Sequence, residues 1–346
     1  MPAILKTDVW DESVLRRLLV GFIDVAHPIY ICALTMLRAG STMPSAVATT
    51  LRLRYYFRYL HERGLDPLEV TRDDLEAWLS TGRDLSPETM RSKLGTVRVL
   101  YEEAIDRDLI VKNPTRRLKI GRYTPPSPPA LSLRDVETLL ATIRQEMNDP
   151  KSMLVGTRDN FVFTLLCTIG PRTSEVLRLA VADLHLDDVR VTADIFGKNR
   201  KHDVKPLPPV VVEGARLWMA ALEGALGRPL RSEDALVVPL SHQAVSGMRA
   251  NPNAILVPMS GAAFFSLVRS RLRDLGLKGP KAGPHRLRKT AATLAWKAKA
   301  DPTEIQRMLG HEHLSTTLDA YIKPAMDLEH AASDSTQLKP IGFSDA

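Results

Sequence analysis

The chain has 346 residues, of which 44% are hydrophobic and 25% charged, and this composition excludes fibrous and disordered classes and favours two compact domains. Its formal net charge of +7 and pI near 9.4 favour an anionic partner, either nucleic acid or an acidic membrane surface. Neither cysteine, Cys32 nor Cys167, belongs to a CxxC pair, which excludes a disulfide framework and a cysteine-rich zinc site.

The beginning of the chain does not follow the pattern of an export signal. Its opening, "MPAILKTDVWDES", lacks a basic segment followed by an apolar one. The apolar stretch 19–37 carries Asp24, His27 and Pro28 near its centre, and each of these is costly in hydrocarbon. We therefore expect buried or partner-facing helices here, no membrane contact and a cytoplasmic location.

Helical periodicity dominates the region before residue 120. Segments 45–64 and 86–109 both have the apolar spacing of amphipathic helices, and the second has Ser86 as N-cap and Pro87 at its first position. Between them, Thr71 with Asp74 three residues later predicts another capped helix. We expect residues 1–120 to form an all-helical domain.

A linker is predicted at residues 121–131. The segment "GRYTPPSPPA" contains four prolines, which remove backbone donors and favour extended structure. It separates the first domain from a second one at 132–332, which is followed by a polar tail at 333–346.

The second domain is also predicted to be mostly helical. Ser132 and Asp135 mark a capped helix, and Asp301 with Pro302 begins another that ends at Gly310, leaving His311 just past its end. The exception is segment 188–209. There Val189, Val191, Ala193 and Ile195 alternate with polar residues before the turn-rich "GKNRKHD", which predicts a β-hairpin with a basic tip.

Four separated stretches carry residues suited to chemistry on one phosphodiester. Arginine pairs bidentately with phosphate oxygens, so two arginines can neutralise the charge of a pentavalent transition state. A tyrosine hydroxyl ionises near pH 10 and needs a proton acceptor to attack phosphorus at neutral pH. A lysine at a hairpin tip can protonate the leaving alkoxide. The residues are Arg172, Lys198, His285, Arg288, His311 and Tyr321, with Lys201 and Lys205 as alternatives to Lys198.

In chain order, "IGPRTSEVL", "FGKNRKHDVKPLP", "PHRLRKT" and "LGHEHLSTTLDAY" resemble the motifs of the tyrosine recombinase (phage integrase) family over roughly the last two thirds of the chain. The resemblance implies a mainly α fold. An N-terminal helical core-binding (SAM-like) domain and a mostly helical catalytic domain with a small antiparallel β-hairpin or sheet would grip opposite sides of duplex DNA.

The resemblance also implies the roles of individual residues. By motif position Arg172 and Arg288 resemble the phosphate-clamping arginines, and Tyr321 resembles the nucleophile that forms a 3′-phosphotyrosyl bond. Lys198 resembles the general acid, His285 the general base and His311 a further phosphate donor, while Glu175 resembles the acidic residue that orients the site. Pro171, Asn199 and Lys289 depart from the usual pattern without removing a reactive group.

Contacts with the DNA backbone are predicted mainly in the first domain. In "RLRYYFRYLHER" basic residues alternate with aromatic ones, which suits phosphate or base contact but equally suits a solvated basic face over an aromatic core. A second basic stripe lies on the helix that follows Ser86. The residues predicted to contact DNA are Arg52, Arg54, Arg58, Arg91, Lys93, Arg98, Lys201 and Lys289.

The sequence thus predicts a site-specific recombinase that cuts and rejoins duplex DNA. Two alternatives remain, a DNA-binding architectural factor of the same fold that does not cleave and a type IB topoisomerase. No cofactor is expected, and no metal, because the histidines lack HxxxH spacing and neighbouring acidic or cysteine ligands. The resemblance implies a homo-tetramer on paired DNA sites and a monomer or weak oligomer when free, bound to the nucleoid when on DNA. Integration, dimer resolution and transposon resolution all remain open.

Overall fold

The computed structural model describes residues 11–38, 43–82, 84–121, 129–197, 202–251, 253–277 and 282–318. The chain divides into two compact units, Met1–Pro126 and Ser127–Ala346. Most of the predicted linker and the whole polar tail lie outside the described residues. Within the described residues, no helix is long and apolar enough to cross a membrane.

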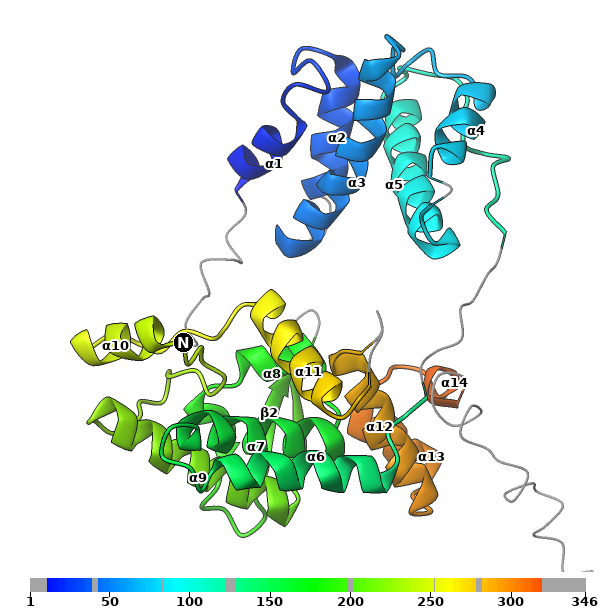
Figure 1. The fold of residues 1–346 in the computed structure, drawn as a ribbon. Coiled ribbons are helices and arrows are strands. Elements are labelled where there is room, and N and C mark those ends of the chain that lie inside the picture. Colours follow the sequence, from blue (N-terminus) through cyan, green and yellow to red (C-terminus); the bar gives the residue numbers. More distant parts are fainter. Residues whose placement is uncertain are drawn as a thin grey trace, which may run out of the picture. The chain divides into compact units, whose positions relative to one another are not determined.

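In its described residues the N-terminal unit is all-helical (Figure 1). Its core combines aliphatic side chains with aromatic ones, among them Tyr56, Trp78 and Tyr101, each less than 2% exposed. The capping box of Thr71 and Asp74 is formed, and Ser86 accepts a hydrogen bond at the start of the longer helix, as the sequence predicts. The helices are α1 (Glu12–Leu19), α2 (Pro28–Arg38), α3 (Met43–Glu62), α4 (Arg72–Ser80) and α5 (Pro87–Asp106).

The C-terminal unit surrounds a nearly fully buried helix, α7, against which α6, α9 and α12 pack (Figure 1). Ser132 and Asp135 form the predicted capping box at the start of α6. The helices are α6 (Leu133–Glu146), α7 (Met153–Thr168), α8 (Thr173–Arg178), α9 (Pro209–Leu226), α10 (His242–Ala250), α11 (Gly261–Asp274), α12 (Pro284–Lys297), α13 (Pro302–Leu309) and α14 (Leu314–Thr317), with a 3-10 turn at Val181–Asp183.

A three-stranded antiparallel sheet of β1 (Leu184–His185), β2 (Thr192–Phe196) and β3 (His202–Pro206) completes this unit. The predicted hairpin corresponds to β2 and β3, and its tip at 198–201 lies outside the described residues. The predicted start at Val189 is wrong, because Val189 is fully exposed and β2 begins at Thr192. Alternation of apolar residues identifies the inward face of a strand better than its end. The short β1 has too few residues to show a pattern.

A buried ion-pair network joins three helices of the C-terminal unit. Arg271 of α11 bonds to both oxygens of Glu146 on α6 and to Asp159 on α7, and Arg158 bonds to the other oxygen of Asp159. Asp159 is 1% exposed. Because buried charges are costly unless paired, this network fixes the positions of α6, α7 and α11 around the core. The architecture is mainly α with one small antiparallel sheet, as expected.

Candidate active site

Two helices of the C-terminal unit end at glycines that direct backbone carbonyls toward one arginine. Gly170 after α7 and Gly310 after α13 have φ of +63° and +65°, a left-handed conformation that glycine adopts without strain. Arg288, 3% exposed, donates hydrogen bonds of 2.6 Å to the carbonyls of Gly170 and Leu309. The negative ends of two helix dipoles therefore hold the guanidinium.

Arg172 stands beside the same turn but is more open to solvent. Glu175, 3% exposed, accepts bonds of 2.7 Å from both the backbone N–H and the Nη1 of Arg172. The Nη2 of Arg172 reaches the Gly310 carbonyl at 3.4 Å, and its side chain remains 41% exposed. An ion pair with Glu175 is thus present, and it orients a guanidinium that is still accessible to an incoming anion.

The turn at Gly310 brings a third element to this place. A Cβ atom at Gly310 would lie 3.4 Å from Asp203 Oδ2 and 4.0 Å from both Arg172 Nη1 and Lys205 Nζ. Strand β3, the start of α8 and the end of α13 therefore meet around one glycine, whose left-handed backbone would be strained with any side chain. This junction gathers the charged residues into a single site.

The protonation state of His311 follows from its two neighbours. Arg288 Nη2 lies 3.0 Å from His311 Nε2, and because arginine can only donate, Nε2 accepts. The neutral ring then carries its proton on Nδ1, which donates to the hydroxyl of Thr317 at 2.8 Å. Thr317 is fully buried. Burial, together with Arg288 and Arg172, lowers the pKa of His311 to about 4, so the ring is neutral at pH 7.

His285 lies at the first turn of α12, at the surface of the unit. Partial desolvation lowers its pKa, and the positive charges of Arg288 and Lys289 lower it further. A neutral imidazole at physiological pH is able to accept a proton, which is what the predicted general base requires. Lys289 is 6% exposed, and burial and Arg286 lower its pKa.

Three of the predicted site residues lie outside the described residues. They are Lys198, Lys201 and Tyr321. Of the three lysines considered as the general acid, Lys205 alone is described, and it is buried. The described residues bring together Arg172, Glu175, Arg288, His311 and Lys205. Sequence reasoning missed Thr317 and the glycine carbonyls, because their contribution depends on distances that residue spacing does not encode.

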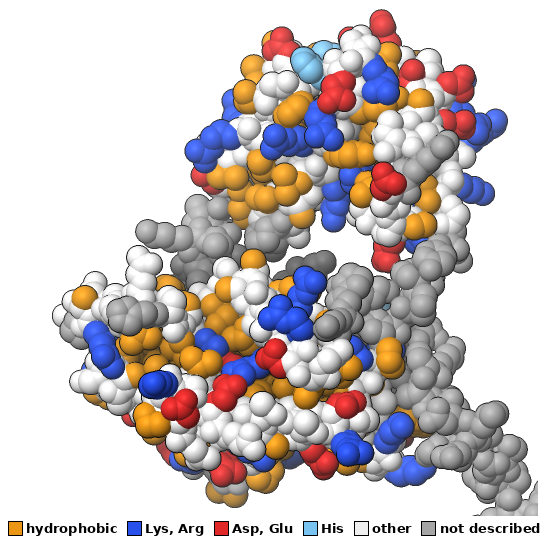
Figure 2. Space-filling model, viewed as in Figure 1, with side chains coloured by type: hydrophobic (Ala, Val, Ile, Leu, Met, Phe, Trp, Pro, Cys, Tyr) orange, Lys and Arg blue, Asp and Glu red, His pale blue; other side chains and the backbone are white. Residues whose placement is uncertain are grey.

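The predicted DNA-contacting residues of the N-terminal unit have mixed surroundings. Arg54 and Arg58 of α3 are exposed, and Lys93 Nζ lies 3.0 Å from the ring centroid of Tyr55. Arg98 bonds instead to Thr115 and to the Leu118 carbonyl within its own unit. Arg52 and Arg91 are partly buried. On the face shown in Figure 2, Lys and Arg side chains lie among acidic and apolar ones, so surface charge alone does not define an interface.

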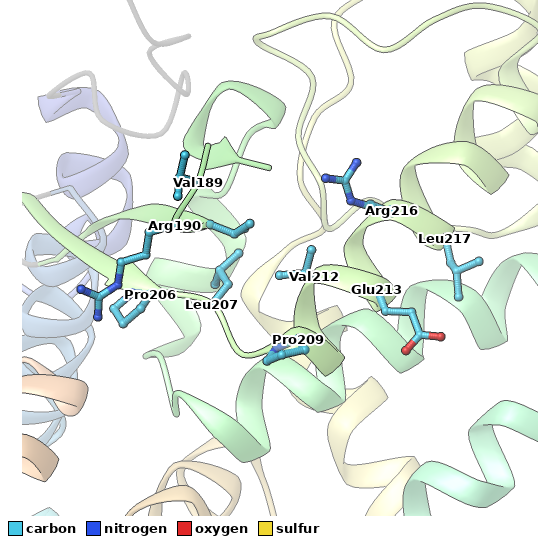
Figure 3. Close-up of a pocket in the computed structure, with 10 residues that line it drawn as sticks. Val189, Arg190, Pro206, Leu207, Pro209, Val212, Glu213, Arg216 and Leu217 are labelled. Carbon is cyan, nitrogen blue, oxygen red and sulfur yellow. The ribbon is translucent and has the colours of Figure 1, made fainter. Parts of the chain in front are cut away.

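A pocket of about 680 Å³ lies away from this site. One wall is formed by the residues just before β2 and just after β3, and the other wall by helix α9. Figure 3 shows Glu213, Arg216 and Leu217 of α9 on one side and Arg190 near Pro206 on the other. It contains none of the predicted catalytic residues. In the described part of the chain, no group of three or more His, Cys, Asp or Glu residues is arranged to hold a metal ion.

Comparison with known proteins relates this chain to one family. The model of the phage integrase family matches residues 130–327. The tyrosine recombinase XerD of Rickettsia conorii is 26% identical over 266 residues, which are 75% of this chain and 81% of XerD. XerC of Shewanella oneidensis is 26% identical over 281 residues, 80% of each chain.

Solved structures show the same fold. The XerH recombinase in its post-cleavage complex with palindromic difH substrate has a TM-score of 0.68 at 19% identity, covering 96% of this chain and 91% of XerH. The Tn1549 transposon integrase in complex with a circular intermediate DNA has a TM-score of 0.61 at 16% identity, covering 86% of this chain and 95% of the integrase.

Proposed function

Since the chain belongs to the phage integrase family and is a site-specific tyrosine recombinase, we propose that Tyr321 attacks a phosphodiester of duplex DNA and forms a 3′-phosphotyrosyl bond. One observation carries this assignment. Arg172, Arg288 and His311 converge on the turn after α13, in the segment that continues to Tyr321. The two guanidinium groups are donors of the kind that a phosphorane transition state requires, and His311 holds the Nη2 of Arg288 beside them.

We assign a separate catalytic role to each residue of the site. Arg172 and Arg288 take the non-bridging oxygens. Glu175 offsets the charge of Arg172, whereas the bonds described for Arg288 go to neutral groups, so the pair keeps positive charge for a phosphate. His285 accepts the tyrosine proton while the oxygen forms its bond to phosphorus. The bond from phosphorus to the 5′ oxygen breaks, and Lys198 supplies a proton to that oxygen. Rejoining reverses each step, so no external energy source is needed.

The proposed substrate is double-stranded DNA, and the acting form is a homo-tetramer that pairs two sites. The relatives support a DNA substrate, because XerH and the Tn1549 integrase were solved on DNA. The cytoplasmic, nucleoid-bound location follows from this substrate. Insertion of a mobile element is the use we favour over resolution of dimers or transposons. A type IB topoisomerase would relax plasmids that lack a recognition site, and a silent factor would bind DNA without forming an adduct.

The test is covalent trapping on nicked suicide DNA. Fragments flanking the gene are first selected by mobility shift, and bound fragments are then incubated with protein and separated on a denaturing gel. We expect an adduct with wild type and none with Tyr321→Phe. The matched control is Tyr30→Phe, because the buried Tyr30 hydroxyl has no hydrogen-bond partner among the described residues. An equal adduct with Tyr321→Phe would refute the assignment, and no adduct from any protein on DNA that it binds would favour the silent factor.

A further inference from the structure

A lysine occupies an inward-facing position of strand β3. Lys205 pairs with Ala193 across the sheet, and the two residues are 5% and 0% exposed. Lysine is almost never buried without a partner, and an apolar residue at this position would complete the sheet's inner face at lower cost. The burial of this charge therefore needs a specific explanation.

The ammonium group of Lys205 bonds to two different elements. Its Nζ donates to Asp203 Oδ2, two residues earlier on β3, at 2.5 Å and to the backbone carbonyl of Arg307 at 2.7 Å. Arg307 is in the last turn of α13, and its carbonyl also accepts the N–H of Gly310 at 3.1 Å. Lys205 thus connects the strand that follows the hairpin tip to the turn that precedes His311.

Charge balance explains the presence of Asp203. Lys205 Nζ and Arg172 Nη1 each lie 4.0 Å from the Cβ position of Gly310, so two cations share this corner. Asp203 Oδ2, 3.4 Å from the same position, offsets the positive charge of Lys205. The lysine can therefore remain close to the phosphate-binding arginines without adding repulsion that would displace them.

We propose that Lys205 is a positioning residue and not the general acid: with Asp203, it locks strand β3 to the C-terminal turn of α13 and so fixes His311 relative to this strand. This inference rests on the proposed strand cleavage. Two of the three ammonium N–H groups are committed to protein acceptors, and the side chain is 6% exposed. A general acid must instead reach the 5′ oxygen of the DNA.

The first measurement is single-turnover cleavage at saturating DNA. Lys205→Met is expected to lower the cleavage rate by about 10- to 100-fold with unchanged DNA affinity, because a displacement of about 1 Å is enough for such a loss. Lys205→Arg, which keeps the charge and the donors, should restore part of the rate, and Asp203→Asn should lower it less than Lys205→Met. Lys151→Met is the control, since Lys151 is exposed between α6 and α7.

The second measurement separates positioning from proton donation. DNA with sulfur in place of the bridging 5′ oxygen has a leaving group that needs no proton, so it rescues the loss of a general acid. We expect Lys198→Ala to be rescued and Lys205→Met not to be. The effect of Lys205→Met should also be non-additive with His311→Ala, because both changes disturb one turn.

Two results would overturn the inference. Rescue of Lys205→Met by the sulfur substrate would show that Lys205 is the general acid. A wild-type cleavage rate in both Lys205→Met and Asp203→Asn would show that this pair has no positioning role. If Lys205→Met does not fold, Lys205→Arg and Asp203→Asn carry the same comparison. Absence of adduct with wild type on bound DNA would count against the proposed function instead, and the two failures are therefore distinguishable.

Discussion

Two arginines of the C-terminal unit are held in opposite ways. Arg271 meets two carboxylates, Glu146 and Asp159, and the Glu146 carboxylate is the main cause that raises its pKa. The bonds described for Arg288 go to neutral groups, two helix-terminal carbonyls and the imidazole of His311. A guanidinium shared by two carboxylates has little attraction left for an anion, whereas one held by dipoles retains its charge. The comparison distinguishes a structural arginine from one suited to a phosphate.

The largest expected effect concerns the structural arginine. Arg271→Ala removes the cation of the partly buried Glu146 and leaves the buried Asp159 with Arg158 alone, and we expect the free energy of unfolding to fall by about 3 kcal/mol. Denaturant unfolding measures this change. At a temperature where the variant is folded, its cleavage rate should match that of wild type. A large loss of cleavage with intact stability would break the comparison.

Arg288→Lys should have the opposite effect, a large loss of cleavage with a smaller loss of stability. Lysine keeps the positive charge but cannot bond to the Gly170 and Leu309 carbonyls and a phosphate oxygen with one planar fork. We expect the single-turnover cleavage rate to fall by about 100- to 1,000-fold, with a smaller change in unfolding free energy than for Arg271→Ala. Equal cleavage by wild type and this variant would remove Arg288 from the site.

Thr317→Val tests the hydrogen bond between Thr317 and His311. The change keeps the shape of the side chain and removes the acceptor for His311 Nδ1–H. We expect cleavage to slow by about 10-fold, as for the loss of one buried hydrogen bond, and Thr317→Ser to recover most of it. Thr316→Val is the control, since Thr316 is adjacent and exposed. An equal effect of both valine substitutions would indicate a general disturbance of α14.

The smallest effect is a dependence of stability on pH. The pKa of His311 falls from 6.5 to about 4 on folding, so the unfolded chain binds more protons between these values. The contribution of the neutral ring is complete above pH 6.5 and is lost as pH falls through about 4. Unfolding free energies of wild type and His311→Gln, measured from pH 7 to 4.5, should differ less at low pH. A constant difference would contradict the lowered pKa.

The sequence predicted the elements of this fold better than their contacts. The capping residues Thr71, Ser86 and Ser132 mark helix starts because a cap is a local interaction between near neighbours. The predicted strand start at Val189 was wrong, because the alternation of apolar and polar residues begins before the first paired residue of β2.

The sequence predicted several residues of the site but not the hydrogen bonds that they form. Motif order placed Arg172, Arg288 and His311 near one phosphate, and the structure brings these three together. The hydrogen bond from Lys205 to Arg307 and that from His311 to Thr317 depend on side-chain direction and on the left-handed turn at Gly310. No residue pattern reports such geometry. The roles of Lys198 and Tyr321 remain predictions, since both lie outside the described residues.

The hydroxyl of Thr317 has a consequence for the direction of the reaction. A hydroxyl accepts the proton of His311 Nδ1 but carries no charge of its own. Rejoining reverses every step of cleavage, so the site must act equally well in both directions. A carboxylate at this position would instead favour a positively charged ring. The neutral threonine leaves the ring uncharged, with Nε2 facing Arg288, whichever way a reversible reaction runs.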